Sequence, residues 1–329
     1  MNCHLRTLLC ALIVGTATAC SNTTPSGPPA LRYKLAGPLI PSHMTMVTAW
    51  DFPQNPLTDP SLDGSTLSTQ VQWGFRLFTN TPAEAPQLVG GEVSCSNCHL
   101  NGGQRERAMP LVAIATAFPE YNRRAGHLIS LNDRIVDCFL RSENATSHLA
   151  SDGHEGRESP DLSGLPDPTS KEVLAIAAYL TWLSRGYEIG RNPTWRGQNA
   201  IPKESLIPID RLDAAKGEAL YLERCTSCHG EDGQGVYVGD KRPGPLWGPL
   251  SWNDGAGAAR TYTLAGIIRY SMPYLDPGSL TDEEAQHLAA FITSKPRPVY
   301  PLKDRDYLAD PLPVDAVYYP KRPPAAPAH

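Results

Sequence analysis

The stretch Cys95-Ser96-Asn97-Cys98-His99 decides the fold of this 329-residue chain, and Cys225-Thr226-Ser227-Cys228-His229 repeats its pattern, C-x-x-C-H. In this pattern the two thiols bond to the vinyl groups of a haem, and the histidine reaches the iron as proximal ligand. A zinc site or a dithiol redox motif would not require the adjacent histidine, and no further cysteine pair is available for zinc. The sequence therefore predicts two covalently bound haem c groups, attached through Cys95, Cys98, Cys225 and Cys228, with His99 and His229 on the irons.

The first twenty residues have the composition of a bacterial signal peptide. The apolar run 8–14 is much shorter than the ~20 residues of a membrane-spanning helix. Ala19 leads into Cys20 in an arrangement that resembles a lipobox, in which the cysteine is lipidated. Ordinary cleavage near Ala19 is the alternative. We predict a signal peptide with a lipobox over residues 1–20, a periplasmic location and a membrane anchor at Cys20.

The charge balance excludes one class of partner. The formal net charge is −5, and removal of the signal peptide takes away one arginine, which leaves −6. A mildly acidic chain does not present the basic surface that nucleic acids require, so no nucleic-acid partner is expected.

One of the eight cysteines is left without an assignment. Two leave with the signal peptide, Cys20 takes the lipid and four bind haem, so only Cys138 remains. A lone thiol in an oxidising compartment is exposed to damage unless something holds it. Cys138 is therefore a candidate functional residue.

A helix predicted over residues 132–141 places cationic side chains beside this cysteine. Helical spacing puts Arg134, Cys138, Arg141 and Ser142 on one face. Two guanidiniums favour the thiolate, the form that acts as metal ligand and nucleophile, and arginines bind oxyanions bidentately. We predict Cys138 as the distal ligand of the first haem, inside an anion pocket. A buried structural cysteine is the alternative reading, and three histidines are alternative ligands: His127, His148 and His154.

The second unit offers a different distal ligand. Met272-Pro273 follows His229 by 43 residues, and a methionine thioether is the usual partner of histidine in cytochromes c. A core-filling role is the alternative for this methionine. In the first unit Met109-Pro110 follows His99 too closely to reach the opposite haem face. We expect proline carbonyls to accept the Nδ1 hydrogen of the proximal histidines instead: Pro110, and Pro243 or Pro245.

The rest of the pattern predicts a mainly α chain with two class I cytochrome c-like domains joined by a linker. Each unit begins with a helix that runs towards its haem motif (67–78 and 213–225), and no β-sheet is expected. Each closes with a helix that starts at a capping box, Thr169 with Glu172 and Thr281 with Glu284. The predicted boundaries are 21–40 for a tether, 41–192 for the first domain, 193–208 for the linker, 209–296 for the second domain and 297–329 for a Pro-rich tail.

Five runs of the sequence resemble the dihaem thiosulfate dehydrogenases, and more distantly the cytochrome subunit of the sulfur-oxidising multienzyme system. The similarity spans roughly residues 60–300. Haem motifs are shared by many cytochromes, so the run around Cys138 is the discriminating one. The runs are Cys-Ser-Asn-Cys-His-Leu (95–100), Asn-Asp-Arg-Ile-Val-Asp-Cys-Phe-Leu-Arg-Ser (132–142), Pro-Leu-Trp-Gly-Pro (245–249), Ile-Ile-Arg-Tyr-Ser-Met-Pro (267–273) and Ala-Ala-Phe-Ile-Thr-Ser-Lys-Pro-Arg-Pro (289–298).

The resemblance implies an active site at a first haem with His/Cys ligation and an electron relay at a second haem with His/Met ligation. It makes Cys138 the catalytic ligand. Two features depart from the family pattern: the lipobox, and Glu143, whose carboxylate is expected to repel a dianion. The residues that the resemblance marks as substrate binders are Arg134, Arg141 and Ser142, with Gln104 and Arg123 as weaker candidates.

The function that the resemblance implies is oxidation of two thiosulfates to tetrathionate, or the reverse. Electrons would pass to an electron-accepting cytochrome or other redox protein. Two alternatives stay open at this stage. The chain could be a dihaem electron shuttle without a substrate, or a subunit that loads thiosulfate onto the thiol of a carrier protein.

Overall fold

The computed structural model describes residues 55–147, 149, 162–193, 195–237 and 242–321. All of them belong to one unit, Gly37–His329. The predicted signal peptide and tether, including Cys20, lie outside the described residues, as do two of the alternative haem ligands, His148 and His154. None of the described helices is long and apolar enough to cross a membrane.

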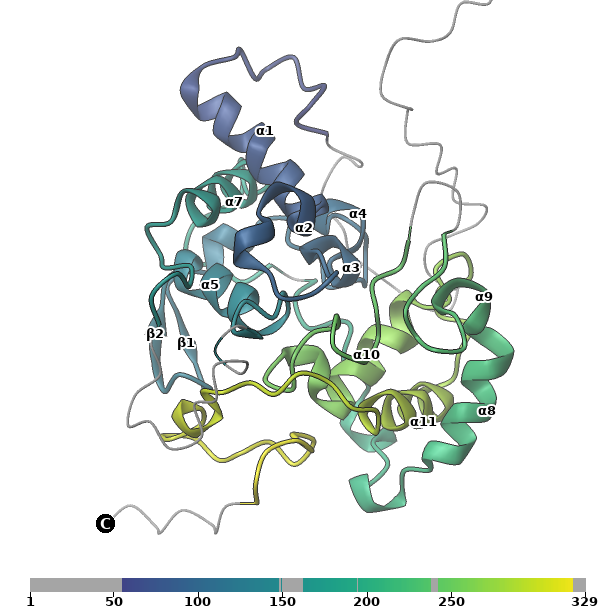
Figure 1. Cartoon of the computed structure of the whole chain (residues 1–329). Coiled ribbons are helices and arrows are strands. Elements are labelled where there is room, and N and C mark those ends of the chain that lie inside the picture. Colours follow the sequence, from purple (N-terminus) through teal and green to yellow (C-terminus); the bar gives the residue numbers. More distant parts are fainter. Residues whose placement is uncertain (1–54, 148, 150–161, 194, 238–241, 322–329) are drawn as a thin grey trace, which may run out of the picture. The chain divides into compact units, whose positions relative to one another are not determined.

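The structure is mainly helical, as predicted (Figure 1). The part of the chain that precedes residue 193 contains α1 (Thr66–Thr79), α2 (Thr81–Glu84), α3 (Cys95–Cys98), α4 (Leu100–Gly103), α5 (Leu131–Arg141) and α7 (Lys171–Trp182). The later part contains α8 (Ala214–Arg224), α9 (Thr226–His229), α10 (Thr261–Ser271) and α11 (Asp282–Thr293). Single 3-10 turns lie at Pro86–Leu88, Ile114–Ala117, Lys203–Ser205, Ile209–Arg211, Gly257–Ala259 and Lys303–Arg305.

A short hairpin was not predicted. Strands β1 (Glu120–Asn122) and β2 (His127–Ile129) pair antiparallel, with Glu120 opposite Ile129. In the turn between the strands, the Asn122 side-chain oxygen accepts hydrogen bonds from the backbone N–H groups of Arg124 and Ala125. Strands of three residues are too short to show the alternation by which a strand is recognised in a sequence.

The helix starts at α1, α5, α8 and α11 confirm four of the five helices predicted from the sequence. The Asp213 carboxylate caps α8 by accepting from the N–H groups of Ala215 and Lys216. Thr281 and Glu284 form the predicted capping box of α11, and α1 spans the helix predicted over 67–78.

The capping box predicted at Thr169 is wrong. Helix α7 is preceded by Ser170, which makes no side-chain cap, and the Thr169 hydroxyl donates to Asp167. The Glu172 side chain is buried and accepts from Gln87 Nε2, 85 residues earlier in the chain. A tertiary contact therefore takes the carboxylate that the local pattern assigned to the helix end.

The two predicted domains are built by the same packing device, which supports their description as a repeat. Helix α1 packs on α7, and α8 packs on α11. A glycine lies at each crossing: a Cβ on Gly74 would stand 1.9 Å from the Ala175 carbonyl oxygen, and one on Gly217 would stand 2.0 Å from that of His287. Only a residue without a side chain permits helices to approach so closely.

Each domain has its own apolar core, and each core surrounds one haem motif. The first cluster draws on residues 71–183, with Cys95 packed against it. The second draws mainly on residues 201–292, with Cys225 and Met272 packed against it. The predicted domain boundaries themselves stay predictions.

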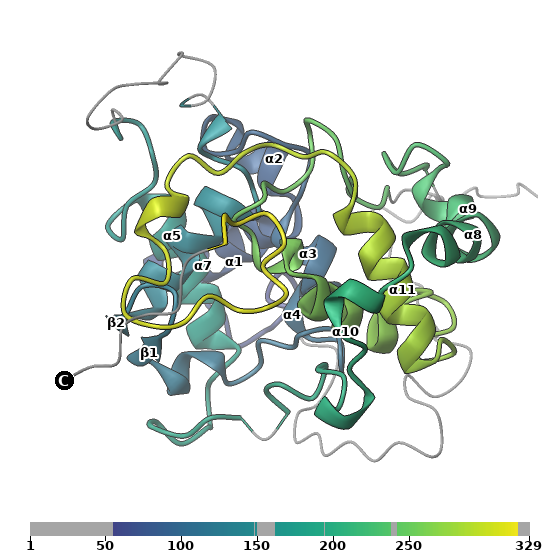
Figure 2. The same cartoon turned by 90° about the horizontal axis from the view of Figure 1, so that it is seen from below.

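The segment 297–321, here called the C-terminal segment, is more than a surface tail. It leaves the end of α11, reaches α5 and the β1–β2 hairpin, and turns back, which the yellow trace shows in Figures 1 and 2. Its side chains are largely buried where it touches the first domain: Tyr300 is 3% exposed and Asp306 3% exposed. The backbone N–H of Tyr307 donates to the Arg124 carbonyl oxygen at 2.8 Å.

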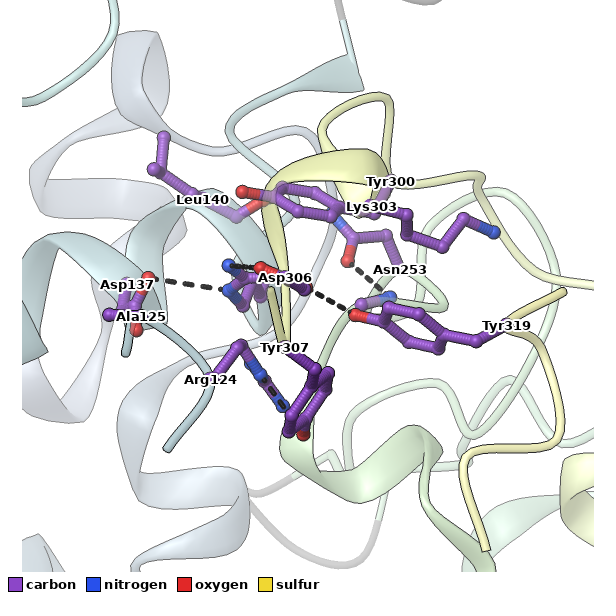
Figure 3. A network of polar contacts seen from close by, with 12 residues as sticks. Arg124, Ala125, Asp137, Leu140, Asn253, Tyr300, Lys303, Asp306, Tyr307 and Tyr319 are labelled. Carbon is purple, nitrogen blue, oxygen red and sulfur yellow. Dashed lines mark hydrogen bonds and ion pairs between the residues drawn. The ribbon is translucent and has the colours of Figure 1, made fainter. Parts of the chain in front are cut away.

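An ion pair joins this segment to α5 (Figure 3). The Arg141 guanidinium donates to both carboxylate oxygens of Asp306, each at 2.8 Å, and both side chains are less than a tenth exposed. Arg141 also lies 3.3 Å from Asp137 and 4.1 Å above the Tyr300 ring, and the Tyr319 hydroxyl donates to Asp306. A buried bidentate pair with additional hydrogen bonds resists separation.

The Asp306→Asn variant should lower the free energy of unfolding of the haem-loaded protein by about 3–5 kcal/mol, because it leaves a buried guanidinium without its main partner. Denaturant unfolding measures this. The control is Asp310→Asn: Asp310 pairs with Arg123, whose side chain is 69% exposed, and such a pair contributes about 0–1 kcal/mol. Equal stability of the two variants would contradict a structural role for the Asp306 pair.

The Gly74→Ala variant should be destabilised by about 1–3 kcal/mol, since the new methyl group would overlap the Ala175 carbonyl and separate α1 from α7. Thermal unfolding of the haem-loaded protein gives the difference. Gly257→Ala is the matched control, because a Cβ at Gly257 meets nothing within 4 Å. A Gly74→Ala protein as stable as this control would show that the close crossing is not required.

Candidate haem sites and active site

The first haem motif opens into an apolar cavity of ≈ 210 Å³. His99 and Cys138 both line this cavity, together with Cys95 and Arg134. Its walls are apolar side chains contributed by several helices, among them Phe78, Ile114, Ile135, Phe139, Ile176 and Leu180. An apolar chamber with a histidine and a cysteine on its wall has the donor set that a ligated haem needs.

The haem-attachment cysteines are held by a helix start. Ser94 caps α3, and the backbone N–H of Ser94 donates to Asn97 Oδ1 at 2.6 Å. This capping box holds the start of the short helix that carries Cys95 and Cys98. Neither cysteine is in a disulfide, and burial raises the pKa of the Cys98 thiol to about 12. Across the described ranges no three His, Cys, Asp or Glu side chains gather as a metal-ion site. These thiols therefore fit thioether attachment of a haem.

His99 is oriented by a backbone carbonyl, as predicted, although the partner differs by one residue. Its Nδ1 lies 2.7 Å from the carbonyl oxygen of Met109, not of Pro110. Met109 has a φ of 50°, and this left-handed conformation sets the direction of its carbonyl. Burial lowers the pKa of His99 to about 4, which favours the neutral imidazole that coordinates a metal through Nε2.

Cys138 lies next to one guanidinium, not two. Arg134 Nη1 is 3.3 Å from the Cys138 Sγ, which confirms the predicted i, i+4 neighbour on α5. The expected net effect on the thiol is wrong: burial raises the pKa of Cys138 above its ordinary value, and Arg134 only opposes this. Desolvation therefore outweighs one cation, and a bound metal ion would be needed to hold the thiolate.

The structure separates the other predicted substrate binders from this cavity. The Arg141 guanidinium pairs with Asp306 and does not line the cavity. Ser142 is the C-cap of α5, and its backbone N–H donates to the Cys138 carbonyl oxygen. Gln104 is buried and donates to the Tyr179 hydroxyl, while Arg123 is exposed beside Asp310. None of the four belongs to the residues that line the first cavity.

Glu143 does not act as the repelling charge that its position suggests. Its side chain is 1% exposed, and its backbone N–H donates to the Cys138 carbonyl at 3.1 Å. Burial raises the pKa of the Glu143 carboxyl to about 8. The group is therefore mainly neutral at pH 7, and it adds little negative charge near the cavity.

Part of the cavity wall comes from the predicted linker, which sequence reasoning treated as a connection only. Trp195, Arg196 and Asn199 line the first cavity. Arg196 is held by Glu120 on β1, at 2.7 Å. The sequence did contain a signal for this role of the linker: a tryptophan beside an arginine in a Pro- and Gly-rich stretch, since a plain linker seldom needs such residues.

The second haem motif lies at the junction of α8 and α9. Tyr221, Trp247 and Phe291 form an aromatic cluster there, with ring centroids 5.3 to 5.8 Å apart. Met272 follows α10 directly and packs, like Cys225, against this core. The His229 Nδ1 is buried and has no hydrogen-bond partner within the described residues, so the carbonyl expected from Pro243 or Pro245 does not reach it.

Comparisons with known proteins agree with this arrangement. The family model described as SoxA/TsdA, cytochrome c domain, matches residues 88–189. The one described as cytochrome c oxidase, cbb3-type, subunit III, matches residues 212–292. These ranges coincide with the two domains that contain the C-x-x-C-H motifs, and a cytochrome c domain implies covalently bound haem c.

Proteins named thiosulfate dehydrogenase are similar over most of the chain. The one from Allochromatium vinosum is 37% identical over 247 residues, which are 73% of this chain and 82% of that protein. The one from Psychrobacter arcticus is 30% identical over 295 residues, 89% of this chain and 76% of that protein. The structure of thiosulfate dehydrogenase TsdBA from Marichromatium purpuratum superposes with a TM-score of 0.60 at 33% identity, over 70% of this chain and 46% of that one. With its two cytochrome c-like domains, this chain belongs to the family of the thiosulfate dehydrogenases, oxidoreductases that act on sulfur compounds.

Proposed function

We propose that this chain joins two thiosulfates into tetrathionate at the first haem and passes the two electrons through the second haem to an external redox protein. The observation that carries the proposal is the position of Cys138, which lines one cavity together with His99 and lies 3.3 Å from Arg134. A cavity that presents a metal-binding imidazole, a sulfur and a cation suits oxidation of a sulfur dianion.

Arg134 supplies the positive charge that brings thiosulfate to Cys138. Its guanidinium lies 3.3 Å from the sulfur on the wall of an apolar cavity, where low polarity strengthens attraction to a sulfonate. Arg141 has its charge satisfied by Asp306 and Asp137, so its role is to hold the end of α5 in place. Glu143 in its neutral form does not weaken the attraction of Arg134 for an anion.

Cys138 acts as the nucleophilic sulfur in two steps. In the first, its thiolate and one thiosulfate form a sulfur–sulfur bond to the sulfane sulfur and release two electrons. In the second, another thiosulfate attacks that sulfane sulfur, tetrathionate leaves, and the Cys138 thiolate is restored, as in thiol–disulfide exchange. The two haems, when bound, would each accept one of the two electrons of the first step. The reverse sequence reduces tetrathionate.

The two proposed ligand sets give the electrons a direction. A thiolate ligand such as Cys138 stabilises ferric iron, and a thioether such as Met272 raises the potential. Electrons therefore run from the first haem to the second. We also propose that the chain is exported and held at a membrane by lipid on Cys20, a reading supported by the lipobox-like sequence alone.

The Cys138→Ala variant should lose thiosulfate-dependent reduction of an artificial electron acceptor by about 10³-fold or more, since the nucleophile is gone. Haem content is checked in the same preparation, because Cys95, Cys98 and His99 remain to hold the first haem. Normal turnover with both haems bound would rule out the role given to Cys138.

A Cys138→Met variant separates the ligand from the nucleophile. A thioether can still bind iron but cannot form the covalent adduct, so this variant should stay inactive while its haem spectrum keeps a sulfur ligand. An active methionine variant would mean that the cysteine only tunes a potential. Inactivity of the unmodified protein until a carrier protein is added would favour thiosulfate loading onto a thiol.

The apparent KM for thiosulfate should rise, by roughly tenfold for a repulsion of about 1.4 kcal/mol, as the pH passes the Glu143 pKa of about 8. Above that pH the carboxylate is charged and repels the dianion, and below it the neutral acid does not. Glu143→Gln should abolish this rise. Glu188→Gln, at a side chain 68% exposed, is the control and should keep it. The same rise in both variants would place its origin elsewhere.

A further inference from the structure

The loop that follows the first haem motif packs against the segment that carries Met272. The Ser271 hydroxyl donates to the carbonyl oxygen of Arg107 at 3.3 Å, and the Arg107 guanidinium lies 5.0 Å from the Tyr270 ring centroid. This loop starts at the end of α4, and Met272 lies directly after the end of α10. The loop follows His99, the proximal ligand of the first proposed haem, and the other segment carries Met272, the distal ligand of the second. The contact between them, here called the junction, therefore connects the two sites.

Arg105 is the most buried charge in this junction. Its side chain comes from the first domain, yet it lies 4.3 Å from the Tyr274 ring centroid, and its Nη2 donates to the Tyr274 carbonyl at 2.8 Å. Tyr274 follows Met272 by two residues. The guanidinium therefore holds the methionine segment from outside its own domain.

This guanidinium lacks an anion. Arg105 is 2% exposed, and its Nη1 has no hydrogen-bond partner within the described residues. Burial lowers its pKa, and no carboxylate acts against that effect. A buried cation without a counter-charge is strongly unfavourable, and nearly all such groups in proteins are paired. The environment of the Arg105 guanidinium within the described residues therefore calls for an anionic partner.

A c-type haem carries two propionates, which are anions of the required kind. We propose that Arg105 is the counter-charge of a propionate of the second haem and a positioning residue for the Met272 segment. The proposal rests on the assignment of His229 and Met272 to that haem. The second haem is favoured because, within the described residues, the hydrogen bond and the cation–π contact of the Arg105 side chain are both with Tyr274, which follows Met272 by two residues.

The charge of Arg105 acts on the redox equilibrium of the haem. Reduction removes one positive charge from the iron, so a fixed cation nearby stabilises the reduced form and raises the midpoint potential. An unpaired propionate would do the opposite. The first domain thus increases the electron affinity of the haem that accepts electrons from it.

The test is Arg105→Gln in the haem-loaded full chain, followed by spectroelectrochemical titration. The second haem is identified by the long-wavelength charge-transfer band that thioether ligation gives to ferric haem. Its ratio of reduced to oxidised form at a fixed potential should fall by roughly tenfold, which is about 59 mV for a one-electron couple. Arg105→Lys keeps the charge and should restore most of the potential.

The matched control is Arg269→Gln, on another face of the same segment. Arg269 lies 5.3 Å from the Tyr270 ring centroid, and its Nε donates to Asp282 at 2.6 Å. Because Asp282 already compensates the charge of Arg269, the loss of Arg269 should loosen the segment but change the midpoint potential of the second haem much less. This variant separates charge from packing.

Three results would overturn the proposal: an unchanged second-haem potential in Arg105→Gln, an equal shift in Arg269→Gln, or a shift confined to the first haem. If Arg105→Gln fails to bind the second haem while Arg105→Lys binds it, the charge requirement stands. Turnover of Cys138→Ala is measured separately, so failure of the proposed chemistry and failure of the Arg105 assignment give different results.

Discussion

The ion pair between Arg141 and Asp306 joins α5, the helix that carries Cys138, to the C-terminal segment, 165 residues later in the chain. The cavity of the first haem depends on where α5 lies, because Arg134 and Cys138 project from it. Asn253 of the second domain strengthens the same helix end by donating to the Leu140 carbonyl oxygen at 2.8 Å. The first site is therefore completed by residues that follow it in the chain by more than a hundred positions.

Charge is buried around the sites in three different ways, each with its own physical consequence. Arg141 is neutralised by two carboxylates and becomes structural. Glu143 lacks a cation, and burial raises its pKa to about 8, so it stays mainly uncharged at neutral pH. Within the described residues, the Arg134 guanidinium donates to the Cys138 sulfur and has no bidentate carboxylate partner such as the one that neutralises Arg141.

Local patterns predicted the helices well, because caps and periodicity act within a few residues. The capping box at Thr281 and the N-cap at Asp213 are of this kind. The same reasoning went wrong where a distant residue competed: Glu172 bonds Gln87 instead of its own helix end. It also counted Arg141 among the substrate binders, because helical spacing gives side-chain directions but does not reveal a distant partner such as Asp306, which takes the guanidinium.

The amino-acid sequence by itself determined the two C-x-x-C-H motifs, the helical class of the chain and the contact between Arg134 and Cys138, because such motifs and i, i+4 neighbours depend on residues close together in the chain. The tertiary structure alone decided that Arg141 pairs with Asp306, that Trp195 and Arg196 wall the first cavity, and that Arg105 reaches Tyr274. Those contacts join positions up to 169 residues apart. Such pairs form only when the packing of both domains brings buried charges and carbonyls together, and no local pattern encodes that meeting.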